Sequence, residues 1–231
     1  MTEPIGLSIN LPVNRVMRAL MHEHDVAIWR SASGRLSAWN NRCPHRGMRL
    51  SHGFVRGEAL ACLYHGWHYD AEGKCRYIPA HPELTPPDTI EVKSYSIEES
   101  SGILWLTTSG KAEPLALPDN LQPVRSITFD CHADAVVKSM SVSTLAGTDG
   151  DPLRIVPISQ KPHALSLETA NGEASVFILL QQCAGQTAAH ILADNNWSAD
   201  GLVEISRWSE ETRRIAEKAV GELAAAEQGV E

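Results

Sequence analysis

Two short clips of cysteine and histidine constrain this chain more than any other feature. The first clip is Cys43-Pro44-His45 and the second is Cys62-Leu63-Tyr64-His65, with sixteen residues between them. Thiolate sulfur and imidazole nitrogen are ligands of transition metals, and four such donors can complete a metal centre. The chain between the clips must therefore fold back, so that two loops at the ends of strands enclose the metal.

The order of the ligands discriminates between two kinds of metal centre. A structural zinc site pairs like ligands on each turn, as Cys-x2–4-Cys and His-x3–5-His. Here each clip carries one cysteine and one histidine. A [2Fe–2S] centre of mixed ligation binds one iron through two thiolates and the other through two imidazoles. The sequence therefore favours such a cluster on Cys43, Cys62, His45 and His65, and with it a role in electron transfer.

The residues around both clips resemble the Rieske domain of the ring-hydroxylating oxygenases. The motif runs through Cys43-Pro44-His45-Arg46-Gly47-Met48 and then Cys62-Leu63-Tyr64-His65-Gly66-Trp67-His68-Tyr69-Asp70. Ile78-Pro79-Ala80 and Gly102-Ile103-Leu104-Trp105-Leu106 extend the resemblance to most of the first half of the chain. It implies a mainly β Rieske domain over residues 1–115, whose cluster ligands are Cys43, His45, Cys62 and His65.

Two positions separate this chain from the Rieske proteins of the respiratory cytochrome complexes. Those proteins carry an extra cysteine in each loop, and the two form a disulfide, whereas the matching residues here are Met48 and Tyr64. Trp67 stands where that branch has a hydroxyl residue near the cluster. We therefore expect few hydrogen bonds to the cluster sulfurs and a reduction potential that is low for the class.

The second half predicts a sheet followed by one long helix. Residues 108–124 are rich in turn formers and divide the chain. Strand patterns follow at residues 126–131, 163–168, 176–180 and 188–193. Ser209 is expected to cap a closing helix that buries Trp208, Ile215, Ala219 and Leu223. This predicts an α+β domain over residues 120–231, which resembles a shortened, helix-grip type catalytic domain of the same oxygenases.

The second half lacks a further metal motif of that family. A complete oxygenase holds a mononuclear iron on two histidines and a carboxylate. The two histidines are five residues apart, and an aspartate lies three residues before the first. Residues 131–141 should carry this motif and do not. We therefore expect no mononuclear Fe(II). The alternative is a rearranged site on adjacent strands, built from His132, His163 and His190 with Asp130, Asp134 or Asp194.

These features predict the electron-transfer component of an oxygenase system, an oxidoreductase component without its own mononuclear iron. Its partners would be a reductase or ferredoxin and a catalytic oxygenase subunit, in a mixed oligomer. Two alternatives stay open. One is a complete small Rieske oxygenase with rearranged iron ligands, which hydroxylates or demethylates an aromatic or N-methyl substrate. The other is a non-enzymatic redox-sensing or assembly subunit.

Composition narrows the possible partners and the compartment. A net charge of −8 disfavours nucleic acid and anionic membranes as partners. No apolar run approaches the ~20 residues that span a bilayer, and Met1-Thr2-Glu3-Pro4 opens no signal peptide. Three cysteines remain beyond the two ligands, an odd number that argues against a disulfide framework. We expect a protein of the cytoplasm.

Overall fold

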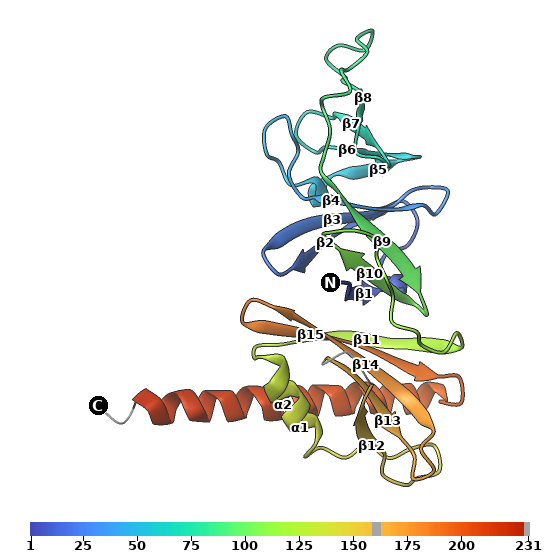
Figure 1. Ribbon diagram of the computed structural model, residues 1–231, viewed down its shortest axis with the longest axis vertical. Coiled ribbons are helices and arrows are strands. Elements are labelled where there is room, and N and C mark those ends of the chain that lie inside the picture. Colours follow the sequence, from blue (N-terminus) through green and yellow to red (C-terminus); the bar gives the residue numbers. More distant parts are fainter. Residues whose placement is uncertain (159–162, 229–231) are drawn as a thin grey trace. The chain divides into compact units, whose positions relative to one another are not determined.

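The computed structural model describes residues 1–158 and 163–228 of the chain. They fall into two compact units, Met1–Ala116 and Leu117–Glu231. The first unit is built of strands, and the second combines a sheet with two α-helices (Figure 1). The predicted fold class is thereby confirmed: a mainly β first part, then an antiparallel sheet with a long C-terminal helix. Residues 159–162 and 229–231 of the predicted second domain lie outside the described residues.

Two antiparallel sheets form the first unit, in the strand orders β1-β10-β9-β4-β3-β2 and β5-β6-β7-β8. The larger sheet comprises β1 (Glu3–Leu7), β2 (Arg15–Met21), β3 (His24–Arg30), β4 (Leu36–Asn40), β9 (Ser94–Ser100) and β10 (Ile103–Thr107). The smaller sheet comprises β5 (Phe54–Arg56), β6 (Ala59–Ala61), β7 (His68–Asp70) and β8 (Cys75–Tyr77). Two 3-10 helices complete the unit, η1 (Ser8–Asn10) and η2 (Leu50–His52). Strands β3 and β4 form an antiparallel hairpin around Ser33-Gly34.

An aromatic cluster joins the two sheets. Trp29 of β3 meets Trp39 of β4 edge to face, with ring centroids 5.1 Å apart. Trp39 meets Tyr69 of β7 in the same way, at 6.4 Å. All three side chains are fully buried, and the thiols of Cys43 and Cys62 belong to the same apolar cluster. The candidate ligand sulfurs therefore lie in the core between the sheets.

The side chain of Asn41 closes the base of the first Cys/His loop. Its Oδ1 accepts a hydrogen bond from the Ser51 N–H at 2.7 Å, and its Nδ2 donates to Ser51 Oγ and Asp25 Oδ1, both at 2.9 Å. Asp25 also pairs with Arg18 at 2.7 Å and with Arg49 at 3.4 Å. Burial acts to raise the pKa of Asp25, but the hydrogen bonds from Arg18 and Asn41 hold it below its ordinary value. One buried amide thus ties β4 to η2 across the loop.

The second unit is a five-stranded antiparallel sheet with two helices on one face. The strand order is β11-β15-β14-β13-β12. The elements are β11 (Leu121–Phe129), α1 (Ala133–Met140), β12 (Arg154–Pro157), β13 (Ala164–Glu168), β14 (Ala174–Cys183), β15 (Gln186–Asp194) and α2 (Ala199–Gln228). Alternate strand residues, among them Phe129, Ile178 and Ile191, pack against the helices. Neither helix, within the described ranges, has the length and apolar character that crossing a membrane requires.

Helix α2 begins earlier than the sequence predicts. It starts at Ala199, and Ser198 is the residue before it, with its Oγ accepting the Gly201 N–H at 3.2 Å. The prediction of Ser209 as the N-cap was wrong. Ser209 is buried inside the helix, where its hydroxyl donates to the Ser206 carbonyl at 2.7 Å. Both serines stand before acidic residues, and the burial of Trp197 and Ile205, on either side of the first helical turn, favours the earlier start.

The buried face of α2 agrees with the prediction at Trp208 and differs from it at Ala219 and Leu223. Ile205, Trp208, Thr212 and Ala216 are buried, whereas Leu223 is 64% exposed and Ala219 is exposed too. The sequence pattern missed this face because it contains hydroxyl residues. Thr212 is acceptable in the core because its Oγ1 lies 2.9 Å from Ser143 Oγ, which follows α1.

Replacing Ile205 by Ala should lower the free energy of unfolding of the second unit by about 2–5 kcal/mol, because it opens a cavity under α2. Replacing Leu223 by Ala on the exposed face should change it by less than about 0.5 kcal/mol. Urea unfolding followed by far-ultraviolet circular dichroism measures both. Equal effects of the two changes would contradict the helix orientation described above.

Replacing Asn41 by Ala should destabilise the first unit by about 1–3 kcal/mol, because the Ser51 N–H and the Asp25 carboxylate lose a buried partner. The part that involves Asp25 is present above the ordinary carboxyl pKa of 3.8 and is lost as the pH falls through the lower pKa of the folded state. Thermal unfolding between pH 3 and pH 7 measures this. Asn40→Ala is the matched control, since its main-chain hydrogen bond to the Lys93 carbonyl at 2.8 Å is retained.

Candidate metal centre

The two Cys/His loops have the same backbone geometry. In each loop the glycine four residues after the cysteine donates its N–H to the cysteine carbonyl. The cysteine N–H in turn donates to the carbonyl of the residue that follows this glycine. The distances are 2.8 Å for Gly47 to Cys43, 2.8 Å for Cys43 to Met48, 2.9 Å for Gly66 to Cys62 and 2.9 Å for Cys62 to Trp67. Both glycines are left-handed, with φ of 69° and 70°. Two similar turns therefore present the four side chains.

The two thiols point into the core. Cys43 is 4% exposed and Cys62 is 3% exposed. Burial raises the pKa of the Cys62 thiol, the N–H groups of Tyr64 and His65 act against this rise, and the neighbouring Cys43 thiol adds to it. An apolar site of this kind disfavours two bare thiolates close together. A bound cationic metal would stabilise both of them.

The two imidazoles lie together at the surface end of the loops. The ring centroids of His45 and His65 are 4.7 Å apart. The indole of Trp67 stacks on His45 at 4.2 Å and 7°, and Tyr64 stacks on His65 at 3.9 Å and 28°. Burial lowers the pKa of His45, and the charges of His65 and Arg46 lower it further, which favours the neutral ring that binds metals. His65 itself is exposed.

The four predicted residues therefore come together as two inward thiols and two outward imidazoles. This donor set fits a [2Fe–2S] cluster, in which each iron takes two protein ligands of one kind. Across the described residues, no three side chains of His, Cys, Asp or Glu are grouped so as to hold a single ion. The bound cluster would supply reversible one-electron chemistry, and the loops would hold it with its imidazole side toward solvent.

Tyr69 is a site residue that the sequence analysis missed. Its hydroxyl lies 3.1 Å from Cys43 Sγ in the buried core. Burial, and then the contact with Cys43, raises the pKa of Tyr69 well above its ordinary value. The phenol therefore stays protonated and can donate a hydrogen bond to a thiolate. The expectation of few hydrogen bonds to sulfur overlooked this group. The alternation of β7 was the available signal, because Tyr69 is buried between half-buried His68 and Asp70.

The three histidines of the second half lie on separate elements. His132 is exposed and precedes α1. His190 is in β15, and its Nδ1 lies 2.8 Å from Ser126 Oγ. His163 directly precedes β13, and β14 lies between β13 and β15. The rearranged iron site assumed that these histidines lie on adjacent strands. In the structure they do not, because β14 separates His163 from His190 and His132 is not in a strand.

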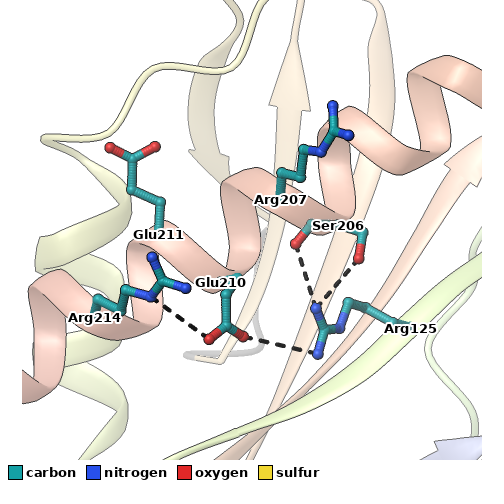
Figure 2. A pocket seen from close by; sticks show the side chains of 6 residues that line it. All are labelled: Arg125, Ser206, Arg207, Glu210, Glu211 and Arg214. Carbon is teal, nitrogen blue, oxygen red and sulfur yellow. Dashed lines mark hydrogen bonds and ion pairs between the residues drawn. The ribbon is translucent and has the colours of Figure 1, made fainter.

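A cavity of about 590 Å³ on the second unit is lined by charged side chains of β11 and α2 (Figure 2). Arg125 donates to the carbonyl and the hydroxyl of Ser206, at 3.4 and 3.2 Å, and lies 3.9 Å from Glu210. Glu210 also pairs with Arg213 at 2.5 Å and with Arg214 at 3.8 Å. The hydrogen bond from Arg213 lowers the pKa of Glu210. The opposite charges of these side chains compensate one another, and the bonds of Arg125 hold α2 against β11.

Comparison with known proteins agrees with the geometry of the first unit. A family model described as "Rieske [2Fe-2S] domain" matches residues 3–96. The oxidoreductase NdmD of Pseudomonas putida is 39% identical over 133 residues, which are 56% of this chain and correspond to 22% of NdmD. The chain thus spans well under two thirds of the length of that relative.

Solved structures resemble the chain over both units. The Pseudomonas putida CBB5 NdmA structure superposes with a TM-score of 0.72 at 19% identity, and covers 94% of this chain and 80% of NdmA. A crystal structure of dicamba monooxygenase also has a TM-score of 0.72 at 19% identity, and covers 99% of this chain and 89% of that enzyme. At this identity the likeness concerns the fold. Residues 3–96 thus match the Rieske [2Fe-2S] domain in sequence, and the described chain shares the fold of the NdmA and dicamba monooxygenase structures.

Proposed function

We propose that this chain is the Rieske iron–sulfur electron-transfer component of an oxygenase system. It takes single electrons from a reductase or ferredoxin and passes them to a catalytic non-haem iron subunit, with which it forms a mixed oligomer. Cys43 and Cys62 bind one iron of the cluster, and His45 and His65 bind the other. The observation that carries the proposal is the pair of matched loops, with thiols inside and imidazoles at the surface.

The outward imidazoles suit transfer of electrons between proteins. His65 is exposed, and its stacked neighbour Tyr64 is 56% exposed. A partner that contacts this end of the loops would reach the cluster through the imidazole rings, while the thiolate side stays sealed in the core. Low solvent access to the sulfurs protects the cluster and helps to set its potential.

Helix α1 supports assigning the oxygen chemistry to a partner. It occupies the segment where the family carries its iron-binding histidines. Counting from Asp134, the two histidine positions of the motif fall on Val137 in α1 and on Val142, just after the helix. Valine has no donor atom for a metal. Val136 and Met140 of the same helix pack in the core, so α1 serves here as a structural helix.

The whole-chain likeness to NdmA and dicamba monooxygenase favours a second candidate, a complete small oxygenase. It would need an iron site built from residues other than those of the family motif. The two candidates differ in the number of irons per chain and in whether the chain oxidises a substrate alone.

Iron analysis of cluster-replete protein should give two irons per chain, and the reduced protein should give the rhombic electron paramagnetic resonance signal of mixed nitrogen and sulfur ligation. Cys43→Ala and His65→Ala should lose the cluster, whereas the matched control His68→Ala should keep it. A third iron, or oxidation of an aromatic or N-methyl substrate with only a reductase added, would favour the second candidate.

Replacing Tyr69 by Phe should lower the reduction potential while the cluster is retained. The phenol donates to the Cys43 thiolate and stabilises the more negative, reduced state. Loss of a differential of ~1 kcal/mol corresponds to about 40 mV for one electron. Protein-film voltammetry measures the shift. Tyr95→Phe is the control, because Tyr95 is buried in the neighbouring core cluster without contact to a ligand sulfur. An unchanged potential in the Tyr69 variant would contradict this role.

A further inference from the structure

Arginines without a carboxylate partner gather near the two cluster loops. Residues 40–57 contain Arg42, Arg46, Arg49 and Arg56 and no acidic residue. Arg49 pairs with Asp25. Arg42 donates to the Gly47 carbonyl at 3.2 Å. For Arg46 and Arg56, no carboxylate in the described part of the chain lies within ion-pair distance. Most other arginines of the first unit are paired, so this segment stands out by its uncompensated charge.

Two arginines of this kind border one groove in the first unit. The cavity has a volume of about 420 Å³ and is lined by Arg15, Ser51, Gly53, Phe54 and Arg56, among others. We call it the arginine groove. Arg15 also has no carboxylate partner within the described residues. Phe54 is 51% exposed, and the guanidinium of Arg56 lies 5.7 Å from its ring centroid. The groove thus offers two guanidinium groups without a carboxylate partner among the described residues, and a half-exposed aromatic ring beside one of them.

The arginine groove adjoins both cluster loops. Phe54 of β5 pairs with Ala61 of β6, the residue directly before Cys62. Ser51 of η2 is the residue that Asn41 holds at the base of the first loop. The groove is lined from β2 and β5, and each is the outermost strand of its sheet. A protein seated here would therefore contact elements that lead directly into the loops.

We propose that the arginine groove is the docking surface for an acidic electron-donor protein. Carboxylates of the donor pair with Arg15 and Arg56, and an apolar side chain of the donor covers Phe54. This rests on the proposed electron-transfer function. The chain as a whole carries a charge of −8, which repels an acidic protein at long range. A local cluster of unpaired cations is what can orient such a partner near the cluster despite that repulsion.

The inference can be tested by stopped-flow reduction of the cluster-replete full chain by a reduced, acidic plant-type ferredoxin. One electron leaves the ferredoxin and one enters the Rieske unit. The second-order rate constant should fall as the ionic strength rises from ~10 to ~300 mM, because salt screens the attraction. A rate constant that rises with salt would overturn the proposal without any variant being made.

Charge-neutral variants locate the contact. Arg15→Gln with Arg56→Gln should slow reduction by ferredoxin about fivefold or more at ~10 mM ionic strength and about twofold or less at ~300 mM. The matched control is Arg35→Gln with Lys111→Gln. It removes the same charge from two exposed residues that already pair with Glu72, at 2.6 Å, and Glu98, at 3.4 Å. If both double variants lost the same fraction of the reduction rate, the change in net charge alone would explain the loss, and the proposal would be overturned.

A neutral small-molecule donor, reduced riboflavin, separates this inference from the proposed function. It needs no docking surface, so it should reduce both double variants at the rate of the unaltered chain. If riboflavin reduces the chain and the Arg15/Arg56 variant keeps its ferredoxin rate, the groove is not the docking surface but the electron-transfer function stands. If no donor reduces the cluster-replete chain, the proposed function itself fails.

Discussion

Burial of two thiols between two sheets is the constraint on which the first unit depends. Cys43 and Cys62 lie in one apolar cluster with Trp29, Trp39 and Tyr69. A thiolate in such a place is costly unless a cation compensates it and donors reach its sulfur. The matched turns, with their glycines in the left-handed conformation, bring both sulfurs to this point. The aromatic cluster then fixes the smaller sheet, and with it the second loop, against the larger one.

The same arrangement separates the two sides of the centre by polarity. The sulfur side is sealed by tryptophans and by a tyrosine that stays protonated. The imidazole side is flanked by Trp67 and Tyr64, which stack on the two rings and restrict their rotation. The imidazole side is therefore the side of the centre that lies nearest to solvent.

The sequence predicted the elements whose signal is local. Ligand spacing located both loops, and alternation located the strands of the second unit except β12. The start and the buried face of α2 could not be predicted in this way. They depend on Ser209 and Thr212, polar residues that enter the core because Ser206 and Ser143 satisfy their hydroxyls. The hydrogen bonds of Asn41 to Ser51 and Asp25, and the contact of Tyr69 with Cys43, were also missed. Each joins residues that are distant in the chain, so no local pattern signals it.

The terminal strands of the two sheets in the first unit carry a consequence for self-association. Strands β2 and β5 end their sheets, and a terminal strand can pair with a strand of a second copy wherever its edge is accessible. Arg15 stands on β2 and Arg56 on β5. Two copies that met edge to edge would bring these like charges together. The arginines thereby disfavour self-pairing at these strands, while an oppositely charged surface is still admitted.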